Sequence, residues 1–178
     1  MKLTRDMIVL AALDVLDERG LDAVSLRAVA ARLSVQAPAL YWHVRSKAEL
    51  LSHMAASFYS EAARAELTAS GWGNRLATYA RILRQVLLTH PDAARLCALA
   101  APLADPHETA LRLAAPLVEA GLDSHRAVAC QACAIAYTVG WVLYEQSQAM
   151  HDHLARMIDF SASFEMGLAA MIRGFTDL

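Results

Sequence analysis

The sequence predicts an all-α protein, with a small three-helix head at the N-terminus followed by a larger helical body. Apolar residues recur at helical spacing along most of the 178 residues, and no sustained apolar/polar alternation indicates a strand. Only seven Gly and five Pro interrupt this pattern. Hydrophobic residues make up 57% of the chain and charged residues 19%, which excludes intrinsic disorder and allows a sizeable core.

The head is predicted to contain three short helices. The first ends at Gly20, after an apolar face formed by Ile8, Ala12, Val15 and Leu16. Ser25 can cap a second helix, which turns inward Leu26, Val29, Ala30 and Leu33. After a tight turn at residues 34–36, Pro38 suits the first turn of a third helix, which is expected to continue through His43.

The body is predicted to contain six further helices. Ser46 can cap a long one over residues 47–67, and the Gly-rich segment 69–73 is the clearest break after it. The remaining helices are expected at residues 74–90, 92–100, 106–120, 123–150 and 160–177. The last shows an apolar stripe made of Phe160, Phe164, Leu168, Met171, Ile172 and Phe175. The domains are therefore expected to be residues 1–47 and 48–178.

Charge and composition bear on the location of the protein in the cell and on where a polyanion could bind. The formal net charge is −2, which excludes a uniformly basic nucleic-acid-binding coat, but residues 1–47 carry seven Lys/Arg against five Asp/Glu. Three cysteines do not suggest a disulfide framework, and the start of the chain lacks a signal-peptide pattern. Residues 127–144 are uncharged but marginal in length for a membrane span. We expect a cytoplasmic protein without a membrane partner, and any polyanion site in the head.

The head pattern fits a helix-turn-helix. Two short helices joined by a tight turn and supported by a third would place the second helix in the major groove of DNA. Arg27, Arg45 and Lys47 flank that helix and could hold phosphates. The alternative is an ordinary helical hairpin with Tyr41 and Trp42 in its core. The pattern alone leaves both interpretations open.

Longer motifs carry a family resemblance. Residues 40–51 read LYWHVRSKAELL, which resembles the signature that closes the DNA-binding domain of TetR-family transcriptional regulators. Residues 20–30 resemble the preceding helix of that family, and residues 138–143 and 171–175 resemble body helices of its tetracycline-repressor branch. The resemblance implies a homodimeric, ligand-responsive regulator of transcription, most often a repressor, which binds a palindromic double-stranded DNA operator.

The resemblance also implies roles for individual residues of the head. Lys47 would clamp a phosphate, Tyr41 and His43 would contact the DNA backbone, and Trp42 would pack the recognition helix. Arg27 would face the DNA. The base-reading edge would comprise Gln36, Ala37, Pro38 and Ala39. Because the tetracycline repressor has polar side chains where Ala37 and Ala39 stand, a different operator sequence is expected.

In the body, the resemblance implies a dimer interface and an effector pocket. The dimer would form through helices 123–150 and 160–177, the alternative being that both serve only the monomer core. The pocket would be lined by Tyr79, Leu83, Cys97, Ala100, Leu113, Tyr137, Trp141 and Tyr144. Cys97, Ala100, Ala101, Ala136 and Tyr144 stand where the tetracycline repressor has polar or metal-ligating residues. We therefore expect a small, largely apolar effector, bound without metal or cofactor; the alternative is simple core filling.

Other features favour no further chemistry. Cys130 and Cys133 have the spacing of a zinc half-site or redox pair, but the sequence offers no second ligand pair. His151 and His153 could bind a metal, but their pattern is more typical of a solvated connection between helices. Cys97 is a further candidate, as a redox sensor. The sequence contains no phosphate loop or nucleophile elbow. An enzyme, or a helical ligand-binding or interaction protein without functional DNA binding, remains the alternative to a DNA-binding regulator.

Overall fold

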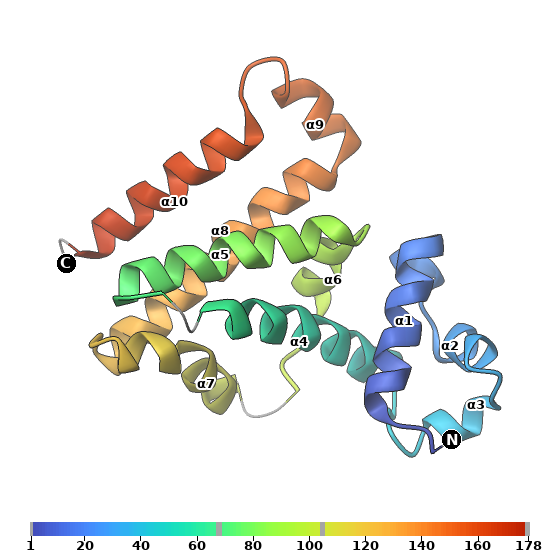
Figure 1. Ribbon diagram of the computed structural model, residues 1–178. Helices are drawn as coiled ribbons and strands as arrows, with labels where there is room; N and C mark the ends of the chain where they lie inside the picture. Colours follow the sequence, from blue (N-terminus) through green and yellow to red (C-terminus); the bar gives the residue numbers. More distant parts are fainter. Residues whose placement is uncertain (1, 67–68, 104–105, 177–178) are drawn as a thin grey trace.

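The computed structural model describes residues 2–66, 69–103 and 106–176, and over these ranges the chain is helical without strands, as predicted (Figure 1). In the head lie α1 (Arg5–Arg19), the short 3₁₀ helix η1 (Leu21–Ala23), α2 (Leu26–Arg32) and α3 (Ala37–Leu40). The body elements are α4 (Lys47–Glu66), α5 (Trp72–Thr89), α6 (Ala93–Leu99), α7 (Pro106–Glu119), α8 (Ser124–Gln146), α9 (Gln148–Leu154) and α10 (Phe160–Thr176).

The head is built from the predicted apolar faces. Ile8, Ala12 and Leu16 of α1 are fully buried and share a core with Val29 of α2. Two ion pairs join the same helices on the outside, from Arg32 to the carboxylates of Asp14 at 2.8 Å and Glu18 at 2.7 Å. The predicted helix ends at Gly20 and Ser25 are confirmed, because Gly20 has φ 75° and the Ser25 hydroxyl accepts from the Ala28 amide at 3.1 Å.

Two backbone hydrogen bonds cap the C-terminus of α2 at the turn of the helix-turn-helix. The Val35 amide donates to the Ala30 carbonyl at 3.0 Å, and the Ser34 amide donates to the Ala31 carbonyl at 3.1 Å. Ser34 itself has φ 55°, the left-handed conformation that this C-terminal motif requires. α2 therefore stops sharply, and α3 begins three residues after Ser34, at Ala37, in a new direction.

α4 connects the head to the body. Its first turn is capped by the Ser46 hydroxyl, which accepts from the Glu49 amide at 3.1 Å, and the Glu49 carboxylate accepts in return from the Arg45 amide at 2.7 Å. Further along, Leu50 and Met54 are fully buried in a core that is continuous from the head into the body. One rigid helix therefore begins beside α3 and ends among the body helices.

The body is organised around α5 and α8, with α4, α6 and α7 on one side and α10 on the other (Figure 1). The predicted single helix over residues 123–150 is wrong in one respect, since it breaks at Ser147, which has an extended backbone. The cause is Gln146, whose side-chain amide donates to the carbonyls of Leu87 at 2.8 Å and His90 at 2.7 Å. These bonds hold the end of α8 against the end of α5, and the chain turns there into α9.

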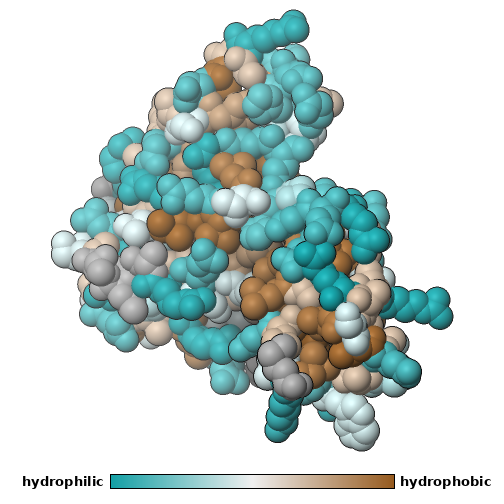
Figure 2. Space-filling model, turned by 45° about the vertical axis from the view of Figure 1, so that its right-hand side comes forward, coloured by the Kyte–Doolittle hydropathy of each residue, from teal (hydrophilic) through white to brown (hydrophobic). Residues whose placement is uncertain are grey.

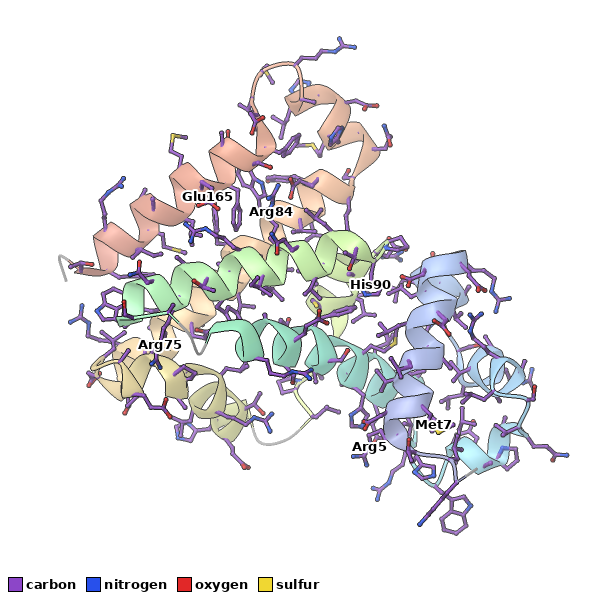
Figure 3. The ribbon with its side chains drawn as sticks, in the orientation of Figure 1. Arg5, Met7, Arg75, Arg84, His90 and Glu165 are labelled. Atoms are coloured by element: carbon purple, nitrogen blue, oxygen red, sulfur yellow. The ribbon has the colours of Figure 1, made fainter. Side chains whose placement is uncertain are left out.

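Charged and aromatic side chains attach α10 to the rest of the body. Arg81 of α5 forms a bidentate pair with Glu165 of α10, and Arg84 forms a largely buried pair with Glu145 of α8. Figure 3 shows Arg84 and Glu165 in the region where α5 and α10 face each other. The Arg84 guanidinium also lies 5.0 Å from the centre of the Phe164 ring. Side chains of α5, α8 and α10 therefore meet at one cluster.

The surface in Figure 2 is a mixture of hydrophilic side chains and smaller hydrophobic patches. Among the described residues, α8 is the helix whose length and composition would also suit a membrane span. The same composition is typical of a core helix, and α8 packs against α5, α6, α7 and α10. Its apolar character is therefore explained by packing within the helical body.

Candidate nucleic-acid interface and ligand cavity

The recognition segment is short and presents a mixed surface. α3 spans only Ala37–Leu40, and residues 41–43 form a turn instead of continuing the predicted helix. Gln36 and Pro38 are exposed, whereas Ala37 and Ala39 are half-buried. Leu40, at the end of the helix, is fully buried in the head core. The edge predicted to read bases is thus accessible mainly through Gln36 and Pro38.

The expected packing of Trp42 is wrong. Its side chain is 90% exposed, and the neighbouring Tyr41 is 53% exposed. The reason lies in spacing, since Leu40 and Val44 are both fully buried and take the inward positions on either side of the turn. Trp42 is left between them, directed to solvent. The alternative of a hairpin with Tyr41 and Trp42 in its core is excluded by the same exposure.

Cationic side chains surround this segment. Arg27 on α2, Arg45 before α4 and Lys47 at the first residue of α4 are all exposed. Lys47 also adds its charge to the helix N-terminus, where backbone dipoles favour an anion. Arg5 of α1 is bonded to the turn at residues 41–43, because its Nε donates to the His43 carbonyl at 3.4 Å.

The body contains a cavity of about 440 Å³ between α4, α6, α7 and α8. Its lining is mostly apolar and comprises Ser52, Ala55, Ala56, Tyr59, Cys97, Ala100, Ala101, Pro102, Leu103, Thr109, Ala110, Arg112, Leu113, Ala132, Ile135, Ala136 and Val139. Three of the predicted pocket residues lie in this wall, namely Cys97, Ala100 and Leu113. The volume suits a small organic ligand.

The other five predicted pocket residues lie elsewhere. Tyr79 and Leu83 are fully buried within the core. Tyr137 and Trp141 face α10 instead, where the Tyr137 ring stacks on Phe164 at 5.3 Å between centroids. Tyr144 is 47% exposed on α8. The prediction that the aromatic residues of α8 line the pocket is therefore wrong. The α8 residues that face the cavity are smaller ones, among them Ala132, Ala136 and Val139.

Sequence reasoning missed the α4 wall of the cavity. Ser52, Ala55, Ala56 and Tyr59 recur at helical spacing, and this small-residue face was the available signal. The Tyr59 hydroxyl hydrogen-bonds to the Cys97 sulfur, and burial raises the pKa of Tyr59. Burial also raises the pKa of the Cys97 thiol to about 11, despite the opposing effect of this bond. Both groups are therefore protonated at neutral pH, which disfavours Cys97 as a reactive thiolate.

Polar contacts join the α5–α6 corner to the head. The His90 ring lies 2.7 Å from the Asp17 carboxylate, Arg95 pairs with Asp22 at 3.0 Å, and the Asp92 carboxylate accepts from the Leu21 amide at 3.0 Å. Figure 3 shows His90 between the end of α5 and α1. The helix that follows this corner, α6, carries Cys97 into the cavity wall. The cavity is thus linked to the head through α6 as well as α4.

The two thiols of α8 differ in their surroundings. Cys130 is buried and Cys133 is exposed, although both are free. Over residues 2–66, 69–103 and 106–176, the structure shows no group of three or more His, Cys, Asp or Glu side chains arranged to hold a metal ion.

A helix-turn-helix head joined by a rigid helix to a body with a ligand-sized cavity defines a class, the ligand-responsive DNA-binding regulators. Comparison with known proteins gives the family. Residues 8–54 match the profile of bacterial regulatory proteins of the tetR family, and residues 65–158 match that of the tetracyclin repressor-like C-terminal domain. The chain belongs to the TetR family and is a DNA-binding, ligand-responsive transcriptional regulator.

Individual relatives cover nearly the whole chain. The class A tetracycline repressor protein from transposon 1721 of Escherichia coli is 37% identical over 97% of this chain and 90% of its own length. A possible TetR-family regulator from Streptomyces coelicolor A3(2) is 32% identical, with a TM-score of 0.76 over 97% of this chain and 98% of that one. TetR from Acinetobacter baumannii AYE is 33% identical, with a TM-score of 0.75 over 99% and 98%. These relatives are regulators rather than enzymes.

Proposed function

We propose that this protein is a cytoplasmic repressor, not an enzyme, in which residues 1–47 bind the operator and residues 48–178 bind the effector and form the dimer. Gln36 and Pro38 would meet base edges, with Ala37 and Ala39 behind them. Arg27, Tyr41, Trp42, His43 and Lys47 would contact the backbone or groove walls. The exposure of Trp42 and Tyr41 supports this, since an apolar side chain left 90% exposed at such a site is available for a partner.

The observation that carries the effector response is the position of α4. Its residues 52–59 form one wall of the cavity, and its first residue, Lys47, lies beside the recognition segment. A ligand that bound one position of α4 better than another would therefore also favour one position of the head. In a dimer, that movement changes the separation of the two heads and their fit to the two half-sites.

The chemistry of the cavity wall supports a largely apolar effector bound without metal. The residues that line it, all within the described ranges, include no Asp, Glu or His. By contrast, a solved class A TetR structure, 34% identical to this chain with a TM-score of 0.75, holds 5a,6-anhydrotetracycline and magnesium. Magnesium prefers oxygen ligands, which the thiol of Cys97 and the methyl groups of Ala100 and Ala136 do not offer.

The dimer would form through α8 and α10. A stripe of mostly small residues follows α8 at helical spacing: Ala129, Cys133, Ala136 and Tyr144 are exposed, and Gly140 within the stripe is half-buried. On α10, the exposed residues Ala162, Met166, Ala169 and Arg173 form a second stripe. Only 33% of the most apolar window of α8 is buried within one chain. Pairing with a second copy in a four-helix bundle would cover the rest.

Selection of DNA from a random duplex pool tests the operator proposal. We expect a palindromic sequence with a steep dependence of log affinity on log salt concentration. Lys47→Ala should reduce that slope by about one, and Gln36→Ala should change the preferred bases. No enriched sequence, or a preference unaltered by Gln36→Ala, would overturn the DNA-reading assignment. It would leave a helical ligand-binding protein as the function.

Release of the selected operator by small molecules then tests the effector proposal. Largely apolar compounds should release wild-type protein without added metal. Ala100→Phe, which would fill the cavity, should abolish that response while operator binding is retained. A response to tetracycline that required magnesium would contradict the metal-free assignment.

A further inference from the structure

The cavity opens toward a cationic mouth. Arg112 of α7 is the one charged residue in the lining of the 440 Å³ cavity as far as the structure describes it. The same residue also lines an outer cleft of about 510 Å³. The cavity and the cleft share Ser52, the loop residues 101–103 and Arg112, so that Arg112 lies where the apolar interior meets the outer cleft.

Arg112 has no assigned partner in the described structure. Other arginines of the body are engaged, for example Arg81 with Glu165 and Arg84 with Glu145. Within the described residues, no hydrogen bond or ion pair involves the Arg112 guanidinium, and its side chain is exposed. Its five N–H groups are therefore available to an acceptor that enters the cavity.

A second cation contributes to the same cleft, from the start of α1. Arg5 lines the outer cleft, and Figure 3 shows it beside the first part of α4. Among the described residues, the ionisable side chains that line this cleft besides the two arginines are Glu49 and His53, which lie 3.8 Å apart. Burial and the charge of Arg5 lower the pKa of His53, which favours its neutral form. Arg5 and Arg112 thus outweigh a single carboxylate.

We propose that the effector is an amphipathic anion, with an apolar body in the cavity and a carboxylate or similar acidic group at the mouth, held by Arg112 and approached by Arg5. This inference rests on the proposed effector site and names the class of ligand that it takes. An apolar wall alone would accept uncharged compounds equally well, whereas two arginines at the exit select for an anion at one end.

The position of Arg5 also connects the anion to the head. Arg5 donates to the carbonyl of His43, in the turn that carries Trp42. A carboxylate at the mouth would be a second, charged acceptor for the same guanidinium, and it would favour side-chain positions that turn Nε away from that carbonyl. Binding of the anion would then loosen the turn directly, in addition to any movement of α4.

A matched pair of fluorescent probes tests the proposal. Pyrenebutyrate and its uncharged amide share the apolar body and differ in the terminal group, and their affinities would be measured by titration of the wild-type protein. We expect the carboxylate to bind about fivefold more tightly, the scale of a partly exposed charge pair. Arg112→Gln should remove this preference by weakening carboxylate binding alone. Arg156→Gln, which replaces an exposed arginine outside the cavity lining, is the control and should change neither affinity.

The results distinguish failure of the anion assignment from failure of the cavity as the effector site. Equal binding of the two probes by wild type, or a preference that survives Arg112→Gln, would overturn the anion assignment and leave the cavity as an apolar effector site. If neither probe bound, or if Ala100→Phe failed to block both, the cavity itself would be rejected as the effector site. Arg5→Gln should reduce the carboxylate preference in part. In the same Arg5→Gln variant, release of operator by pyrenebutyrate should weaken more than release by the amide.

Discussion

The Asp92 carboxylate accepts a hydrogen bond from the Leu21 backbone amide at 3.0 Å, and this bond joins the body to the head across 71 positions of sequence. Asp92 makes it from a left-handed backbone conformation, with φ 58°. Gly20, beside Leu21, allows the close approach, because a Cβ there would lie 3.3 Å from the same carboxylate oxygen. The contact therefore depends on the left-handed backbone of Asp92 in the body and on the missing side chain of Gly20 in the head. It lies at the corner that leads into α6.

Asp92→Ala should destabilise the protein by about 2 kcal/mol. It removes the acceptor, at about 1 kcal/mol, and places alanine in a left-handed conformation, at about 1 kcal/mol more. Asp92→Gly removes only the acceptor and should cost about half as much, while Asp92→Asn retains both features and should be nearly neutral. Urea unfolding measures all three. Equal losses for alanine and glycine would show that the backbone conformation of Asp92 carries no cost.

Gly167→Ala should destabilise the packing of α10 on α8. A Cβ at Gly167 would overlap the hydroxyl oxygen of Tyr137, and that hydroxyl now donates to the Phe164 carbonyl at 2.9 Å. Tyr137 must move and lose its bond, at a cost of about 1–3 kcal/mol. Thermal unfolding measures the loss.

The double variant Gly167→Ala/Tyr137→Phe provides the control for this clash. Removing the hydroxyl relieves the closest contact, so the double variant should be more stable than the sum of the two single changes predicts. The rescue should be incomplete, because ring carbons of Tyr137 would still lie 3.0 Å and 3.2 Å from the new methyl group. Strict additivity would contradict the steric explanation.

Acid should weaken the attachment of α10 through Glu165. The hydrogen-bonded Arg81 guanidinium lowers the pKa of Glu165 below its ordinary value of 4.5. Because the folded pKa is below the unfolded one, the stabilisation is fully present above about pH 4.5 and is lost as pH falls through the folded pKa. In Arg81→Met, this part of the pH dependence should flatten. Unfolding free energies between pH 6 and 3 test it, and parallel curves for the two proteins would contradict it.

The periodicity of the sequence was sufficient to predict the all-α fold and the caps at Ser25 and Ser46, because these depend on local spacing and local hydrogen bonds. The break of α8 at Ser147 was not predictable in this way. It depends on Gln146 binding carbonyls of Leu87 and His90, 59 and 56 positions away. Local pattern cannot show a partner that only tertiary packing supplies.

The candidate sites illustrate the same limit. Exposure of Arg27, Gln36 and Lys47 agrees with their predicted positions on the head. In the body, helical periodicity marks Tyr137 and Trp141 as apolar, but two opposite faces of α8 are apolar, one toward the cavity and one toward α10. Only the three-dimensional arrangement shows which neighbour each face meets.

Gly140→Leu should separate the dimer while the chain stays folded. A Cβ at Gly140 meets no atom within 4 Å in one chain, so a larger side chain there has room, and it removes a glycine from the interior of α8. Across a closely packed helix interface, the same side chain would clash. Sedimentation should show a monomer with unchanged helical circular dichroism. Ala98→Leu, on the exposed face of α6, is the matched control and should remain dimeric. A dimeric Gly140→Leu would move the interface away from this stripe of α8.

Trp42→Ala should weaken operator binding without weakening the fold. The indole is 90% exposed, so its removal takes little apolar surface from the core, and the free energy of unfolding should change by less than about 0.5 kcal/mol. On DNA, the same side chain would be covered, and losing one good contact should reduce operator affinity roughly tenfold. Met157→Ala, which shortens a side chain that is 62% exposed far from the head in sequence, should change neither quantity. If Trp42→Ala instead lowered stability by more than 1 kcal/mol with operator affinity intact, Trp42 would be a packing residue after all, as the family resemblance implied.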